Sequence, residues 1–174
     1  QEKIAELLWA MDDMVEKEKN VMQKTVKLFL SFSKKVFTEA DGEEKELKDI
    51  CELIMGQSPP GHTYNENGDG FAFLQGNAEF GDRFPQNIKY TTAPKKIVPK
   101  GSILISVRAP VGDLNIADQD YCIGRGLAGI IIVDTGLRDY VYNFLKFAEY
   151  ELNKYSSGST FKAINKDKLS SLRL

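Results

Sequence analysis

The first 37 residues repeat apolar side chains at the spacing of a long coiled-coil helix. Apolar residues recur at alternating steps of three and four, with Glu18 and Thr25 at the two polar positions of this stripe, and a second apolar row flanks it at a spacing of seven. The predicted interface residues are Ile4, Leu7, Leu8, Met11, Met14, Val15, Val21, Met22, Leu28, Phe29, Phe32 and Val36. This heptad pattern predicts that residues 1–37 form a helix that packs against another helix.

The length of this helix bears on what covers its apolar stripe. At about 1.5 Å per residue it would be a rod roughly 55 Å long, longer than the domain that follows could cover. A partner helix is the expected solution, either from a second copy or from a missing part of the same polypeptide. The alternative is a long amphipathic core helix of one compact domain.

After a polar, acidic stretch at residues 38–46 (TEADGEEKE), which we interpret as a linker, the pattern becomes that of short strands. Strands are predicted within residues 71–76, 102–108, 114–118 and 128–134, separated by Pro- and Gly-containing turns. One amphipathic helix is predicted at about 137–154, ended by YSSGS. The chain is therefore expected to be α+β, with a long coiled-coil helix, a linker at 38–46 and a mixed, mostly β domain at 47–174.

The charged residues are distributed unevenly along the chain. The net charge is −2, yet residues 83–112 hold six basic side chains and no acidic one: Arg83, Lys89, Lys95, Lys96, Lys100 and Arg108. This segment is either a locally basic, solvated loop or a phosphate-facing patch on an otherwise acidic protein.

Composition excludes several classes of protein. Cys51 and Cys122 are too few for a disulfide framework, and with His62 as the only histidine a zinc site is not expected. No apolar run is long enough for a membrane span and no signal-peptide pattern is present. We expect a reduced, cytoplasmic protein with no metal and no membrane segment.

Two motifs resemble sites of enzymes. Gly124–Gly129 spells G-x-G-x-x-G, but the β-branched residues 130–133 follow it where a dinucleotide loop needs a helix. Ser58-Pro59-Pro60 matches part of the D/N/S-P-P-aromatic motif of adenine methyltransferases, but Gly61 stands in place of the aromatic residue. No spacing suggests a hydrolytic set of residues. We therefore expect no catalytic residue and no cofactor in this chain.

Several stretches resemble the specificity subunit of type I restriction–modification systems. ICELIMGQSPPGHTYNENGDGFAFLQGNAEFGDRFP (50–85) is similar to the opening of that family's target recognition domain, and KGSILISVRAPVGDLNIADQDYCIGRGLAGI (100–130) to its central strands. SGSTFKAINKDKLSSLRL (157–174) resembles its end, and QEKIAELLWAMDDMVEK (1–17) the start of its conserved helix. The family's subunit carries two recognition domains and two helices, which pack as an antiparallel coiled coil. This chain shows one of each, so we interpret it as a half-subunit, either a fragment or a unit that pairs with a second copy.

The resemblance implies a non-catalytic role in DNA recognition. One domain would bind each half of a bipartite site in double-stranded DNA, and the helices would fix the separation of the halves and dock the modification subunits. Those subunits would carry S-adenosylmethionine, and a restriction subunit is a further expected partner. The predicted DNA-binding residues are Gln57, His62, Tyr64, Gln75, Asn77, Arg83, Lys89, Tyr90, Lys95, Lys96, Arg108 and Arg125. The basic ones are expected at phosphates, and Gln75, Asn77, Arg108 and Arg125 at bases.

Two other functions are open at this stage. One is a coiled-coil dimerisation module whose second domain binds protein, and the other is a small S-adenosylmethionine-dependent methyltransferase. Binding of S-adenosylmethionine to the chain alone would favour the methyltransferase. Charge reversal at Lys95 and Lys96 separates the remaining two functions, because it should weaken binding to DNA but spare assembly with proteins.

Overall fold

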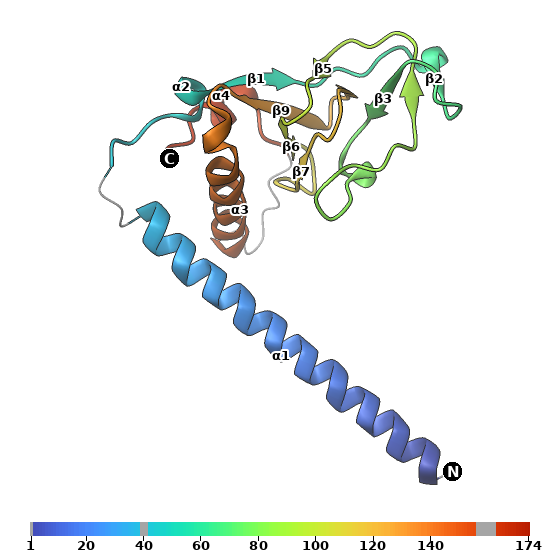
Figure 1. Ribbon diagram of the computed structural model, residues 1–174, viewed down its shortest axis with the longest axis vertical. Helices are drawn as coiled ribbons and strands as arrows, with labels where there is room; N and C mark the ends of the chain where they lie inside the picture. The colour runs from blue at the N-terminus through green and yellow to red at the C-terminus, as the bar shows by residue number, and fades with distance from the viewer. Residues whose placement is uncertain (1, 39–41, 156–162) are drawn as a thin grey trace. The chain divides into compact units, whose positions relative to one another are not determined.

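The computed structural model of the chain describes residues 2–38, 42–155 and 163–174. It contains two units, Gln1–Asp41 and Gly42–Leu174, which we treat separately (Figure 1). We call the second one the C-terminal unit.

The first unit is a single long helix, α1 (Glu2–Thr38), as the heptad pattern predicts. Ten of the twelve predicted interface side chains are exposed by 49–71%, whereas Phe29 and Val36 are half-buried. A row of large apolar side chains in water is unfavourable, because each loses the gain of roughly 1.5–3 kcal/mol that burial would bring. The apolar stripe is therefore a surface that a partner could cover.

The C-terminal unit is built on two small sheets. The four-stranded sheet has the order β1-β9-β6-β7 and is antiparallel throughout. Its strands are β1 (Cys51–Met55), β9 (Leu127–Ile132), β6 (Ile103–Ser106) and β7 (Leu114–Ile116). The five-stranded sheet has the order β2-β4-β3-β8-β5, in which β3 and β8 are parallel. Its strands are β2 (Tyr64–Asn65), β4 (Tyr90–Thr91), β3 (Phe71–Leu74), β8 (Tyr121–Ile123) and β5 (Ile97–Val98).

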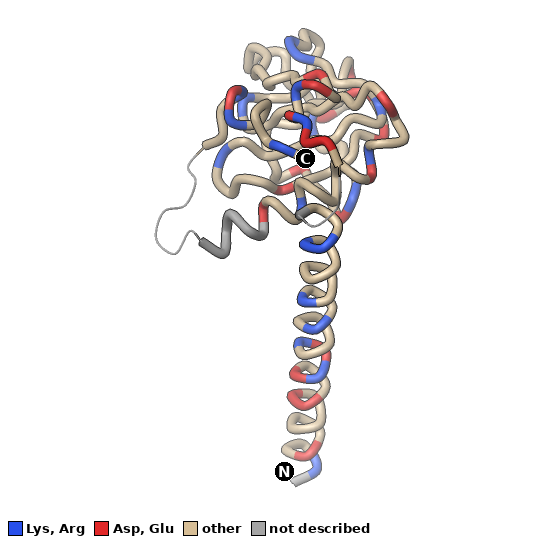
Figure 2. The backbone as a smooth tube through the Cα atoms, turned by 90° about the vertical axis from the view of Figure 1, so that its left-hand side faces the viewer, with Lys and Arg blue, Asp and Glu red and all other residues tan. Residues whose placement is uncertain are grey.

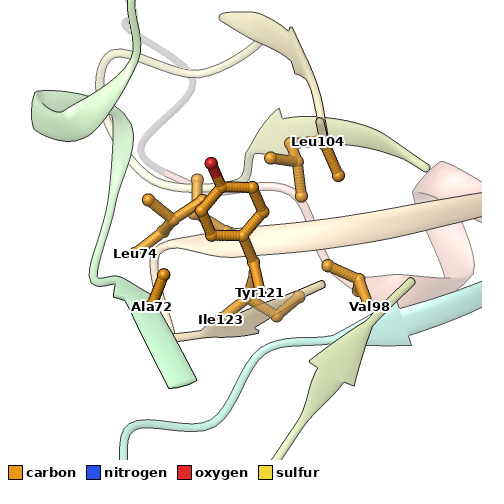
Figure 3. Close-up of a cluster of buried hydrophobic side chains, with 8 residues drawn as sticks. Ala72, Leu74, Val98, Leu104, Tyr121 and Ile123 are labelled. Atoms are coloured by element: carbon orange, nitrogen blue, oxygen red, sulfur yellow. The ribbon is translucent and has the colours of Figure 1, made fainter. Parts of the chain in front are cut away.

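A hydrophobic core joins the two sheets. Ala72, Leu74, Val98, Tyr121 and Ile123 come from the five-stranded sheet or its rim, and Leu104 and Leu127 from the four-stranded one (Figure 3). Gly129 of β9 faces Val98, and a Cβ atom at Gly129 would lie only 2.2 Å from Val98 Cγ1. The glycine therefore lets the sheets approach closely, as tight packing of a protein interior requires.

Among its described residues, this unit also has three helices: α2 (Leu47–Ile50), α3 (Arg138–Tyr155) and α4 (Lys166–Ser170). Helix α3 confirms the amphipathic helix predicted at 137–154, and it buries Val141, Phe144, Leu145 and Phe147. The stretch predicted to end it, YSSGS, lies outside the described residues after Tyr155. Short 3₁₀ helices occupy Gly61–Thr63, Asn77–Glu79 and Thr135–Leu137.

The beginning and the end of the C-terminal unit are bonded to each other. Lys45 and Leu174 exchange two backbone hydrogen bonds, of 3.2 and 2.9 Å, and the Leu47 N–H donates to the Leu172 carbonyl at 2.8 Å. The unit is therefore closed by its own two ends, as expected for a domain that folds around its own core.

The four predicted strands are confirmed as β3, β6, β7 and β9. The sequence pattern did not indicate β1, β2, β4, β5 or β8. β8 is three residues long and entirely buried, and β1 follows α2 without an intervening turn, so neither shows a clear alternation of apolar and polar residues. Both strands nonetheless contribute to the site described below, because Gln57 follows β1 and Arg125 follows β8.

Candidate nucleic-acid interface

Six strands of the two sheets place one of their ends in the same region. There β1, β3, β6 and β8 end, and β5 and β9 begin. Backbone hydrogen bonds hold these ends together: the Gly124 N–H donates to Leu74 at 2.7 Å, that of Ile123 to Lys96 at 2.9 Å, and that of Val107 to Gly126 at 2.9 Å. The Gln57 N–H donates to the Ile123 carbonyl at 2.9 Å. Segments far apart in the sequence thus meet at one place.

Six of the twelve predicted DNA-binding residues lie at this place. They are Gln57, Gln75, Lys95, Lys96, Arg108 and Arg125, and all six side chains are exposed. We call this group the polar end. It presents two amides, two guanidinium groups and two ammonium groups, which are the side chains that donate hydrogen bonds to base edges and to phosphate oxygens.

Three glycines let the backbone segments of the polar end approach so closely. A Cβ atom at Gly56 would lie 2.0 Å from the Gly124 carbonyl oxygen, and one at Gly126 would lie 2.8 Å from that of Gln75. Gly124 is similarly close, at 3.0 Å, to Gln75 Cα. None of the three has a positive φ, so their role is close approach of the backbone rather than an unusual turn conformation. The consequence is that Arg125 projects from a tightly supported turn.

The cations of the polar end have no carboxylate partner among the described residues. Within the described part of the chain, no ion pair involves Lys95, Lys96, Arg108 or Arg125. By contrast, Arg173 is 3.7 Å from Glu44, and Arg83 is 3.7 Å from Asp139. The unpaired cations give the polar end a positive potential that attracts an anionic partner.

Arg83 is placed elsewhere. Its ion pair with Asp139 puts it beside the start of α3, and its carbonyl oxygen accepts a hydrogen bond from Ile116 of β7. Lys100 also lies apart, because its N–H donates to Asp120 just before β8, at the opposite end of that strand. The basic segment 83–112 therefore does not form one patch, and the polar end receives only Lys95, Lys96 and Arg108 from it.

Three other predicted residues have partners inside the C-terminal unit. The Asn77 amide donates to Asp113 Oδ2 at 2.6 Å. The Tyr64 hydroxyl donates to the Pro59 carbonyl at 2.9 Å, and its ring lies 4.8 Å from that of Phe73. Tyr90 is half-buried against the core between the sheets. These contacts give all three a structural role.

His62 and Lys89 are the last two of the twelve. His62 is exposed on the 3₁₀ helix Gly61–Thr63, and Lys89 is half-buried, with its carbonyl accepting a 2.8 Å bond from Phe73. Lys89 thus lies beside Phe73 of β3, which comes two residues before Gln75 in the chain. Neither belongs to the polar end as we define it.

Ser58 is a supporting residue that the sequence pattern did not single out for binding. Its Oγ accepts a hydrogen bond of 3.4 Å from the N–H of Arg125. The flanking Pro59 and Pro60 carbonyls accept bonds from Tyr64 and Thr63. The Ser58-Pro59-Pro60 motif thus supports a loop beside Arg125. In the sequence, the glycines on both sides of Arg125 were the signal that another segment of backbone packs closely against this turn.

Other features of this region bear on enzymatic function. Gly124–Gly126 connects β8 to β9, and Leu127–Gly129 already belong to β9, so a strand follows this motif where a dinucleotide loop needs a helix. Burial raises the pKa of the Cys122 thiol, which keeps it protonated and unreactive beneath the polar end. Among the described residues, no group of three His, Cys, Asp or Glu side chains could hold a metal ion. No described helix has the length and apolar character needed to cross a membrane.

Comparison with known proteins identifies the family. The model of the type I restriction modification DNA specificity domain matches residues 39–174. The chain belongs to this family. The match spans the entire C-terminal unit, including the polar end.

The similarity to individual relatives also includes α1. A putative type I restriction enzyme MjaX specificity subunit of Methanocaldococcus jannaschii is 38% identical over 194 residues, which cover 100% of this chain and 46% of the relative. The solved HsdS subunit from Thermoanaerobacter tengcongensis has a TM-score of 0.78 and 34% identity, covering 98% of this chain and 44% of that one. A chain from a structural study of assembly and conformational transition in the type I R-M system has a TM-score of 0.84 and 35% identity, covering 99% and 45%.

The chain therefore spans about half the length of these relatives. Their structures share the arrangement of a long helix and a strand-rich domain, and the predicted α+β fold is confirmed.

Proposed function

We propose that this chain recognises one half of a bipartite sequence in double-stranded DNA, as half of a type I specificity subunit. The observation that carries the proposal is the convergence of Gln57, Gln75, Lys95, Lys96, Arg108 and Arg125 at the polar end. The loops of a rigid sheet scaffold supply the contacts. A cationic surface rich in amide and guanidinium donors suits the grooves of duplex DNA.

The six side chains divide into two roles. Lys95 and Lys96 are compact, strongly hydrated charges, so they bind phosphates and set the position of the protein on the duplex. Gln75, Arg108 and Arg125 read bases, because an amide can bind adenine and a guanidinium can bind guanine through two hydrogen bonds. The amide of Gln57 contributes in either way.

Helix α1 serves assembly rather than recognition in this proposal. Its exposed stripe packs antiparallel against the corresponding helix of a second half-subunit, which fixes the distance between the two half-sites. The paired helices dock two modification subunits, and a restriction subunit joins the complex. The modification subunits hold S-adenosylmethionine and perform the chemistry, so this chain is non-catalytic and acts in the cytoplasm, where it meets DNA.

The test is a binding titration of the complex assembled with its modification subunits. Lys95→Glu/Lys96→Glu reverses two charges at the polar end. Lys45→Glu/Lys100→Glu is the matched control, because both lysines are exposed and lie toward the opposite end of the strands. Duplexes with and without the target sequence are titrated at several salt concentrations. The target sequence is found beforehand by mapping methylated bases in cells that carry the system.

We expect the polar-end variant to lose at least tenfold in affinity for DNA while its assembly is unchanged. Each phosphate contact contributes about 0.9 to the slope of log affinity against log salt concentration, so the slope should flatten by about two. The control should retain the wild-type affinity and slope. Equal affinities for the two variants would show that the polar end does not face DNA. If the polar-end variant instead bound DNA normally but no longer assembled with the modification subunits, the C-terminal unit would be a protein-binding domain.

A further inference from the structure

A short exposed stretch of the C-terminal unit lies beside the polar end without belonging to it. We call residues 86–89 (QNIK) the flanking segment. The N–H of its first residue donates to the Glu79 carbonyl, and the carbonyl of its last residue accepts a hydrogen bond from the Phe73 N–H, both at 2.8 Å. Since Gln75 of the polar end comes between Phe73 and Glu79 in the chain, the flanking segment is fixed at both ends to the stretch that carries Gln75.

The pairing of β3 with β4 places the middle of the flanking segment more closely. Ala72 of β3 pairs with Tyr90 of β4, and in an antiparallel pair each step forward on one strand is a step backward on the other. Three such steps put Asn87 level with Gln75, with Ile88 one residue away. Neighbouring strands lie about 4.8 Å apart and neighbouring base pairs about 3.4 Å apart, so these side chains can reach the same base pair or adjacent ones.

The two middle side chains of the flanking segment face water. Ile88 is exposed by 48%, although it is large and apolar. Asn87 is exposed as well, and within the described part of the chain its amide makes no hydrogen bond. By contrast, the amides of Asn77 and Asn115 donate to other parts of the C-terminal unit. Both side chains are therefore available to a molecule bound at the polar end.

The flanking segment belongs to an uncharged stretch. Charged residues, blue and red in Figure 2, occur at many places in the C-terminal unit, but residues 84–88 contain none. A phosphate would call for cations, whereas the edges of bases carry no formal charge. Adenine presents an acceptor and a donor that one Asn amide can bind through two hydrogen bonds, and thymine presents a methyl group that an apolar side chain can contact. Asn87 and Ile88 thus match the two bases of one pair.

We infer that the flanking segment reads one A·T base pair of the half-site, with the Asn87 amide on the adenine and Ile88 against the methyl group of the thymine. The polar end then contacts the neighbouring base pairs and the phosphates. The inference rests on the proposed function and names a base pair that this chain selects. It can fail while the proposed function holds, because no residue of the polar end belongs to the flanking segment.

Base analogues in the target duplex test this inference, with the chain assembled with its modification subunits. Deoxyuridine in place of thymidine removes only the methyl group, and 7-deazaadenine lacks only the N7 acceptor. Each thymine and adenine of the half-site is replaced in turn, and affinity is measured for the wild type, Ile88→Ala and Asn87→Ala. Phe84→Ala is the matched control, because Phe84 is exposed by 47% but follows Arg83, which is held beside the start of α3.

We expect the wild type to lose about fourfold in affinity when one particular thymine is replaced by uracil, which is the effect of one buried methyl-sized group. Ile88→Ala should bind the unmodified duplex at least fourfold more weakly and should no longer distinguish uracil from thymine at that position. Asn87→Ala should likewise become insensitive to 7-deazaadenine in the same base pair. Phe84→Ala should respond to both analogues as the wild type does.

Several results would overturn the inference. An equal penalty for uracil in the wild type and in Ile88→Ala would mean that another side chain contacts the methyl group. A wild type that is insensitive to uracil at every position would exclude the contact altogether. If Ile88→Ala lost assembly with the modification subunits but kept its choice of duplex, the segment would contact protein instead. In each case Lys95→Glu/Lys96→Glu would still weaken DNA binding if the proposed function is correct, so the two failures are distinguishable.

Discussion

The two units of this chain differ in whether their large apolar side chains are exposed or buried. In α1, Leu28 and Phe32 are exposed by 71% and 67%, whereas Leu104 and Phe73 of the C-terminal unit are fully buried. The C-terminal unit has its own core, two sheets that pack together and ends that are bonded to each other. Helix α1 has local side-chain bonds, between Lys17 and Asp13 and from Thr25 to the Val21 carbonyl. A helix in a protein gains most of its stability from the packing of its apolar face, and most of the apolar stripe of α1 is exposed.

This difference separates two tasks. The C-terminal unit holds its polar end rigid without any other chain, so recognition depends on residues that the unit itself positions. Helix α1 needs a partner to cover its stripe, so assembly depends on a second chain. Substitutions in one unit should therefore leave the task of the other unit intact, and four sets of variants examine this separation.

Leu104→Ala should have the largest effect, because it removes a fully buried side chain between the two sheets. A loss of about 2–5 kcal/mol in the free energy of unfolding of the C-terminal unit is expected. Leu28→Ala makes the same chemical change on the exposed stripe and should leave that unfolding transition unchanged while weakening dimerisation. Denaturant titration followed by circular dichroism and light scattering measures both. Equal losses in the two variants would contradict the separation.

Gly126→Ala should disturb the polar end itself. The added methyl group would lie 2.8 Å from the Gln75 carbonyl oxygen and 3.2 Å from Gly76 Cα, both backbone atoms, so the strand ends must move apart. We expect a loss of about 1–3 kcal/mol in stability, typical of overpacking, together with weaker DNA binding. Gly61→Ala is the control, because a Cβ atom at Gly61 would have nothing within 4 Å. Unchanged DNA affinity for Gly126→Ala would show that this turn is not part of the interface.

Arg125→Ala should change the choice of sequence more than the strength of binding. If the guanidinium reads one base pair through two hydrogen bonds, its loss removes about 1–3 kcal/mol of discrimination at that position. Affinity for DNA without the site should fall much less. Arg125→Lys retains the charge but not the two-pronged geometry, so it should show the same loss of discrimination. Titration of duplexes substituted at each position of the site measures this discrimination. An unchanged preference between base pairs would mean that Arg125 only forms part of the turn.

Glu18→Leu should strengthen the pairing of α1. The new leucine fills one of the two polar positions in the apolar stripe, so the dissociation constant of the paired helices should fall about tenfold, as one buried apolar side chain can provide. Binding of DNA by the polar end should not change. Analytical ultracentrifugation gives the constant. Weaker pairing would indicate that Glu18 has a charged partner on the other helix.

The sequence predicted the long helix, four strands and helix α3 because each carries a strong local periodicity. It could not predict how the short strands associate, since β3 and β8 pair across a long stretch of chain, Phe73 with Cys122, through contacts that no local pattern records. The same limit applies to the site. Exposed polar residues could be named, but Asn77 and Arg83 form their contacts with Asp113 and Asp139, which only the tertiary fold brings near.

The central claim is that the polar end faces DNA, and crosslinking in the assembled complex tests it most directly. A photoreactive amino acid is placed either at Gln57 or at Val133, an exposed residue at the opposite end of β9 whose N–H donates to Ile50. With target DNA bound, we predict DNA crosslinks from position 57 and none from position 133. Crosslinks from position 133 without any from position 57 would contradict the account.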